Sequence, residues 1–194
     1  MQSSKLMVPE MRSEKLVEID SHCACAMSGI VGDARILIDH GRVEAQNHAF
    51  NFNEPMGVEA ITQSISDIAI NFGEGYKESK RKPMARPYGV ALLIGGVDEN
   101  GPQLYATDPS GTYTEWQANA IGAGQETAMT TIKEQYHSTM TLEEAEKMIL
   151  QTLKNVMEDT ISRDNVEVTI IRSDTRKWER RSPDQLDAII KNLA

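Results

Sequence analysis

The stretch 86–112, RPYGVALLIGGVDENGPQLYATDPSGT, is the part of the chain that decides the fold. Its apolar run 90–94 is too short for an ordinary helix and is bounded by glycines and a proline, which favours a buried strand. A β-prone run follows at 103–107. The segment 108–111, Asp-Pro-Ser-Gly, suits a type I turn, and a third strand is expected at 112–117. The stretch therefore predicts an antiparallel meander.

Helices are expected on both sides of this meander. Before it, apolar residues recur at helical spacing in two segments. These residues are Ala34, Leu37, Ile38, Gly41, Ala45 and Ala49 in the first segment and Val58, Ile61, Ile65, Ile68, Ala69 and Phe72 in the second. Gly41 inside a helix costs about 1 kcal/mol relative to alanine, so it predicts the close approach of another backbone.

After the meander, two capping boxes each predict the start of a helix. One begins at Thr141 and the other at Ser182, where Pro183 stands at the first helical position. The first of these helices is expected to bury one stripe, consisting of Ala145, Ile149, Thr152, Leu153 and Val156. Between the two helices, alternating apolar residues at 166–170 predict a strand, and 176–180 is a plausible partner.

The resulting order is strands, two helices, a meander, two helices, two strands and a final helix. This grouping predicts an α+β fold in which two helical layers pack on antiparallel sheets. The length of 194 residues fits a single domain, 1–194, with one substantial core. No internal repeat is visible.

The overall charge limits the classes of partner. A formal net charge of -9 argues against nucleic acid and against anionic membranes, because both would repel the protein. No apolar stretch reaches membrane-spanning length, and Met1 is followed by polar residues rather than by a hydrophobic signal core. We therefore expect a cytoplasmic and nuclear protein. The basic segment 76–87 is interpreted as a solvated linker rather than a phosphate contact.

Motifs for cofactors are incomplete. His22, Cys23 and Cys25 could be half of a zinc site, but no second ligand pair follows, so Cys23 and Cys25 are interpreted as buried thiols on one strand face. The segment 121–127 resembles a dinucleotide loop, yet Thr127 replaces the third glycine and Glu126 would repel a phosphate. We expect neither a metal nor an organic cofactor.

Several segments in chain order resemble the alpha-type subunits of the proteasome core particle. The resemblance centres on GVALLIGGVDENGPQLY and DPSGT, whose wording is most similar to the fifth alpha type. It continues through VEID at 17–20, AMSG at 26–29 ahead of DAR at 33–35, NAIGAG at 119–124 and TLEEA at 141–145. The family signature falls on Arg86, Pro87, Gly89, Asp108, Pro109, Ser110 and Gly111.

The resemblance implies the αββα sandwich of N-terminal nucleophile hydrolases, here without the family's first strands and N-terminal helix. It also implies a non-catalytic structural subunit of the outer alpha ring, acting in ubiquitin-dependent protein degradation. Its expected partners are the other alpha subunits of a hetero-heptameric ring, the beta subunits and, through the family's N-terminal part, regulatory particles or activators. Residues Arg35, Asp39 and Arg42 are expected at the junction with the beta ring.

The alternative is an N-terminal nucleophile hydrolase with its own peptidase or amidase activity. Catalytic relatives use an N-terminal threonine whose own amine is the base, whereas this chain begins Met1-Gln2, so a processed Ser3 or an unseen cofactor would have to carry the chemistry. No Gly-x-Ser-x-Gly or His-Glu-x-x-His motif occurs, and the four histidines are scattered. We therefore expect no catalytic residue.

The family's gating tail, docking helix, first sheet strands and activator-pocket lysine all precede the segment that this chain matches. None of these features can be assigned to a residue here. A sandwich without its first strands would leave unpaired strand edges and uncovered apolar surface. We therefore expect a chain of this extent to be marginally stable on its own and unable to gate a channel or bind activators.

Overall fold

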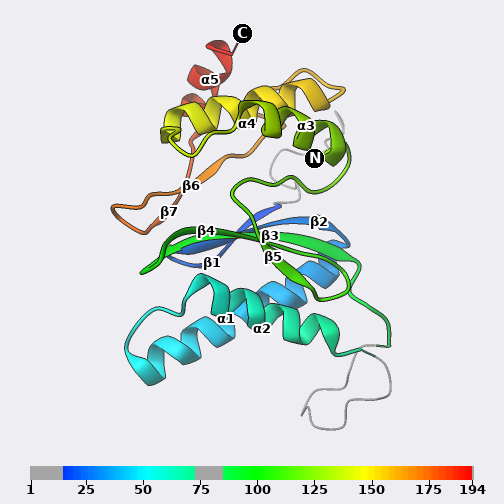
Figure 1. Cartoon of the computed structure of the whole chain (residues 1–194), viewed down its shortest axis with the longest axis vertical. Coiled ribbons are helices and arrows are strands. Elements are labelled where there is room, and N and C mark those ends of the chain that lie inside the picture. The colour runs from blue at the N-terminus through cyan, green and yellow to red at the C-terminus, as the bar shows by residue number, and fades with distance from the viewer. Residues whose placement is uncertain (1–14, 73–84, 194) are drawn as a thin grey trace.

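The computed structural model describes residues 15–72 and 85–193. A five-stranded antiparallel sheet lies at the centre of the protein. Its strands lie side by side in the order of the sequence (Figure 1). They are β1 (Leu16–Asp20), β2 (Cys23–Gly29), β3 (Val90–Asp98), β4 (Gly101–Thr107) and β5 (Tyr113–Glu115). The predicted meander is β3, β4 and β5, and its Asp108 carbonyl accepts the Gly111 N–H at 3.0 Å, as the predicted turn requires.

Helices lie on both sides of the sheets (Figure 1). Helices α1 (Val31–Phe52) and α2 (Val58–Ile70) cover one face of the five-stranded sheet. Beyond its other face lies a two-stranded sheet, β6 (Thr169–Ile171) with β7 (Trp178–Arg180), and then a layer of three helices. These helices are α3 (Gln125–Gln135), α4 (Leu142–Val156) and α5 (Pro183–Lys191). The predicted order of layers, which is helix, sheet, sheet and helix, is confirmed.

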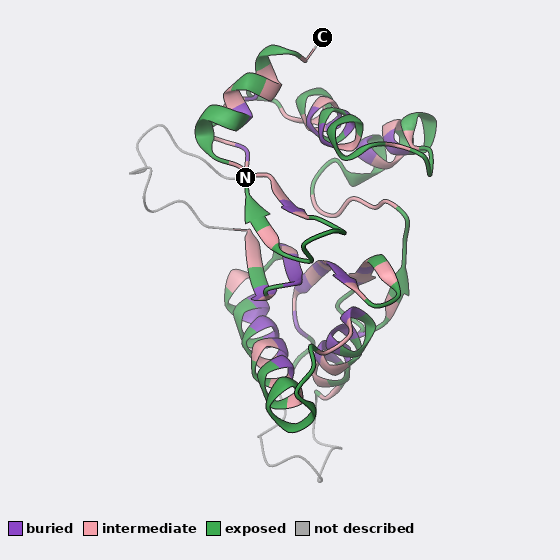
Figure 2. Cartoon of the chain, turned by 90° about the vertical axis from the view of Figure 1, so that its left-hand side faces the viewer, coloured by how far each residue is buried: buried purple, intermediate pink, exposed green. Residues whose placement is uncertain are grey.

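The main core lies between the five-stranded sheet and the α1–α2 layer. Buried residues gather on the sheet-facing sides of these two helices (Figure 2). Cys23, Cys25 and Met27 point into this core, while Ala26 and Ser28 on the alternate positions of β2 are half-buried. The predicted face of this strand is therefore confirmed, as the period-2 alternation of a strand requires.

Two details of the α1–α2 layer differ from the sequence predictions. Gly41 is approached by a side chain and not by another backbone, because a Cβ there would lie 2.8 Å from Cδ1 of Ile65. Ala49 and Phe72 were expected in the buried stripes, but both are exposed. The last turn of α1 extends past the core, and α2 ends at Ile70, before Phe72.

A smaller core, formed by Leu150, Ile161 and Val166, joins α4 to the segment that precedes β6. Both predicted capping boxes are present, at Thr141 and at Ser182. The predicted buried stripe of α4 is wrong at Ile149, which is 48% exposed, whereas Glu146 is buried. The periodicity of apolar residues could not reveal that α4 turns Glu146 inward, because the Glu146 carboxylate is buried through its bond to Arg181, which lies 35 positions away.

The two buried cysteines are expected to resist alkylation in the folded protein. Burial raises the pKa of the Cys23 thiol to about 12, helped by the negative charges of Asp20 and Asp98, and burial also raises the pKa of Cys25. Because the reactive species is the thiolate, iodoacetamide should modify neither residue at pH 8 until the chain unfolds. Intact mass spectrometry with and without 6 M guanidinium measures this, and rapid native modification would contradict it.

Candidate functional site

The first half of the family signature, which is Arg86, Pro87 and Gly89, links the start of β3 to the start of α1. The Arg86 guanidinium donates to both oxygens of Asp33, at 2.7 and 3.1 Å, and the Gly89 N–H donates to the same carboxylate at 2.8 Å. Asp33 itself is only 4% exposed. The hydrogen bonds from Arg86 and then from Gly89 hold the pKa of Asp33 below its ordinary value. This linkage therefore stabilises the fold above the ordinary pKa of aspartate and is lost as the pH falls through the lowered one.

The second half of the family signature, residues 108–111, forms the turn between β4 and β5. The Ser110 N–H donates to the Asp108 carboxylate at 2.8 Å, which is the local bond that favours aspartate at the start of such turns. Gly111 has φ of +81° and lies against the end of α2 at Ile70 and Ser66. The two halves thus fix the sheet to α1 and to α2, so the signature orients the helical layer.

Two of the three predicted interface residues lie together, and the third is separate. The Arg42 guanidinium donates to Asp39 at 3.1 Å and to the backbone oxygen of Glu18 in β1 at 2.7 and 3.0 Å. Arg42 therefore covers an outward-facing carbonyl of the sheet's edge strand. Arg35, in contrast, is an exposed side chain near the start of α1.

An exposed apolar stripe on α1 has no counterpart among the sequence predictions. Ile36, Val43 and Phe50 are 48%, 44% and 90% exposed. They are spaced seven residues apart, so they share one face of the helix. The regular spacing was a usable signal, but the stronger pattern of buried residues on the opposite face concealed it.

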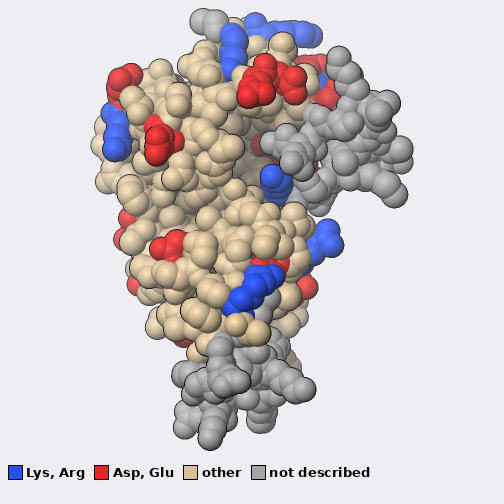
Figure 3. Space-filling view, turned by 90° about the vertical axis from the view of Figure 1, so that its right-hand side faces the viewer, with Lys and Arg blue, Asp and Glu red and all other residues tan. Residues whose placement is uncertain are grey.

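No group of three metal-ligating side chains occurs in 15–72 and 85–193. Within the same ranges, no helix is long and apolar enough to cross a bilayer. On the face drawn in Figure 3, acidic and basic side chains are scattered rather than gathered into one basic patch.

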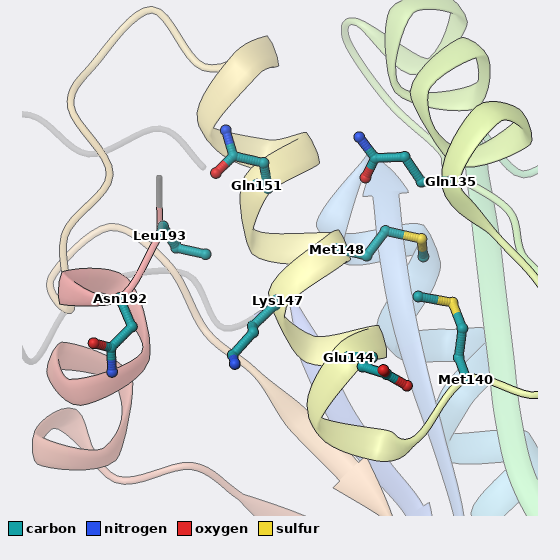
Figure 4. A pocket seen from close by; sticks show the side chains of 8 residues that line it. All are labelled: Gln135, Met140, Glu144, Lys147, Met148, Gln151, Asn192 and Leu193. Carbon is teal, nitrogen blue, oxygen red and sulfur yellow. The ribbon is translucent and has the colours of Figure 1, made fainter.

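A hollow of about 410 Å³ lies in the layer formed by α3, α4 and α5. Met140 and Met148 point their thioethers toward one another on one side of it, and Glu144 and Lys147 lie nearby on α4 (Figure 4). The Glu144 carboxylate accepts the backbone N–H of Thr141 at 2.8 Å, as part of the capping box. Its position is therefore explained by the start of the helix, without a ligand.

Comparison with known proteins identifies the family. The family model described as "Proteasome subunit" matches residues 1–171. A protein of Dictyostelium discoideum named "Proteasome subunit alpha type-5" is 52% identical over 180 residues, which are 93% of this chain and 74% of that protein. Proteins of the same name from Trypanosoma brucei brucei and Drosophila melanogaster are 49% and 42% identical, with 93% and 99% of this chain and 72% and 78% of theirs covered. This chain belongs to the proteasome subunit family.

Proposed function

We propose that this chain is a non-catalytic structural subunit of the outer alpha ring of the proteasome core particle. The observation that carries the proposal is the match to alpha type-5 subunits over 93% of the chain at about half identity. Its role is then to assemble with other proteasome subunits and to support controlled protein degradation in the cytoplasm and nucleus. Nothing in the comparisons favours the alternative of a hydrolase with its own activity.

The surface proposed to meet the beta ring is the outer face of α1, as the resemblance to alpha-type subunits implies. Three observations support this choice. The apolar stripe Ile36, Val43 and Phe50 faces away from the core. Exposed Arg35 and Asp39 lie beside that stripe on the same helix, so charged side chains border the apolar ones, as at the edges of other protein interfaces. The signature anchors at Asp33 and Gly111 hold the helix layer rigidly against the sheet.

Phe50→Ala is expected to weaken co-assembly with beta subunits by tenfold or more. An aromatic residue that becomes buried at an interface commonly contributes a large part of the binding energy. At 90% exposed, Phe50 can be removed without opening a cavity in the fold. The measurement is the yield of alpha–beta assemblies by native mass spectrometry after co-expression, relative to wild type.

The matched control is Phe72→Ala, which removes an exposed aromatic residue beyond the end of α2 and should not affect assembly. Arg35→Glu tests the polar rim separately. Arg42 is unsuitable for that purpose, because its bonds to Glu18 stabilise β1. Equal yields for wild type and Phe50→Ala would contradict the proposed surface, while failure of wild type to enter any particle would contradict the proposed function.

A further inference from the structure

The tip of the β3–β4 hairpin carries an asparagine that is followed by a glycine. Asn100 and Gly101 are the only such pair in the sequence. Asn100 is exposed, and its side-chain amide has no hydrogen-bond partner among the described residues. The space around the Cβ position of Gly101 is open. Neither crowding nor a hydrogen bond therefore holds the Asn100 amide away from the Gly101 backbone nitrogen.

The backbone of this pair lies at the end of the strand ladder. Asp98 and Gly101 are the last residues of β3 and β4 that pair with each other. Gly101 has φ of +100°, while Glu99 and Asn100 do not have positive φ, which is the pattern of a type I turn followed by a glycine bulge. When this end pair opens, the backbone of Asn100 can rotate while the rest of the ladder stays formed. A reaction between the two residues therefore needs local opening only.

We propose that Asn100 is a site of spontaneous deamidation, which converts it mainly into isoaspartate. The Gly101 nitrogen bonds to Cγ of Asn100 and gives up its proton, and the side-chain nitrogen leaves as ammonia. Glycine favours this step because it has no Cβ to hinder the approach. Water then opens the succinimide ring. If the bond between the Gly101 nitrogen and Cγ breaks, aspartate results. If the bond to the backbone carbonyl carbon breaks, isoaspartate results, and the main chain then runs through the former side chain.

The hairpin turn is connected to the start of α2 through Asp98. Its Oδ1 accepts the Asn100 N–H at 2.8 Å, and its Oδ2 accepts the Val58 N–H at 3.0 Å. Val58 is the first residue of α2 and is completely buried, and the preceding Gly57 has no side chain that could cap the helix. Asp98 therefore satisfies a buried helix N–H, and its negative charge is favourable at this end of the helix.

Isoaspartate at position 100 disturbs this link in two ways. It adds one atom to the main chain ahead of Gly101, so the end pair of the ladder loses its register. It also places a free α-carboxylate beside the N–H that Asp98 accepts, and the two negative charges repel each other. Asp98 is thereby pushed away from the turn, and the Val58 N–H loses its acceptor. The conversion of one exposed amide thus loosens the start of a buried helix.

The proposed site is tested by incubating the purified 194-residue chain in neutral buffer at physiological temperature for several weeks, followed by peptide mapping with mass spectrometry. Asn100 should convert within about tenfold of its rate in a free peptide of residues 98–103. Gly101→Ala should slow the conversion by about tenfold or more. The internal control is Asn155, which is exposed but lies in α4 ahead of a β-branched valine, and it should stay unchanged. An intact Asn100 when the free peptide has converted, or equal rates in wild type and Gly101→Ala, would overturn the proposed site.

The effect on α2 is measured by hydrogen exchange of the Val58 amide. Anion-exchange chromatography separates the converted protein, because the reaction adds a negative charge. Exchange at Val58 should be roughly five- to tenfold faster in the converted protein, since a helix N–H has lost its carboxylate acceptor. The matched control is Asn100→Asp, which adds the charge without the extra main-chain atom and should accelerate the exchange less. Equal exchange at Val58 in the converted and unconverted proteins would overturn the link between the hairpin and α2.

Discussion

Replacing Arg181 with methionine is expected to lower the free energy of unfolding by about 3 kcal/mol. The Arg181 guanidinium donates through Nε and Nη2 to the two carboxylate oxygens of Glu146, at 2.6 and 2.8 Å. Glu146 is only 6% exposed. Without the arginine, the Glu146 carboxylate stays buried between α4 and α5 with neither partner nor water. Removing one partner of a buried ion pair destabilises a protein more than removing both.

A double variant separates the worth of the ion pair from the cost of an orphaned charge. Glu146→Leu combined with Arg181→Met removes both charges, and it should recover most of the stability that Arg181→Met loses. The control is Arg172→Met, which breaks an exposed pair with Asp174 and should leave the urea midpoint nearly unchanged. Urea unfolding followed by circular dichroism measures all three variants. A loss below about 1 kcal/mol for Arg181→Met would show that water reaches Glu146.

Local signals account for the parts of the fold that could be predicted from the sequence. The meander follows from the turn at 108–111, and the capping boxes at Thr141 and Ser182 each satisfy N–H groups within three residues. The face of β2 followed from simple alternation at Cys23 and Cys25. In each case, the residues that determine the structure are neighbours along the chain.

The parts that could not be predicted depend on contacts between distant residues. Arg86 meets Asp33 across 53 positions, and Arg181 meets Glu146 across 35. A buried glutamate on α4 violates the apolar stripe that periodicity predicts, because its partner arrives from another element. The exposed apolar stripe of Ile36, Val43 and Phe50 on α1 shows the same limit. The seven-residue spacing groups Phe50 with Ile36 and Val43 on one face of the helix, but apolar character alone does not reveal whether that face is covered.

Gly111→Ala is expected to cost about 4 kcal/mol of stability, through two separate effects. At φ of +81°, a residue with a Cβ is strained by about 1–2 kcal/mol. The added Cβ would also collide with Cγ1 of Ile70 and lie 2.9 Å from the Ile70 backbone nitrogen and 3.1 Å from the Ser66 oxygen. Two of these three neighbours are backbone atoms of α2, so relief requires the helix to move away from the sheet, at a cost of about 1–3 kcal/mol.

Two other glycines separate strain from crowding. Gly101 has φ of +100° with open space around its Cβ position, so Gly101→Ala should show the backbone strain alone, about 1–2 kcal/mol. Gly32 lies in the first turn of α1 with open space and no positive φ, so Gly32→Ala should stabilise the protein by up to about 1 kcal/mol. The order expected in urea unfolding is therefore Gly32→Ala, wild type, Gly101→Ala and Gly111→Ala, from most to least stable. If Gly101→Ala and Gly111→Ala lose the same stability, the contact with α2 contributes nothing. The signature glycine would then be required only for its turn.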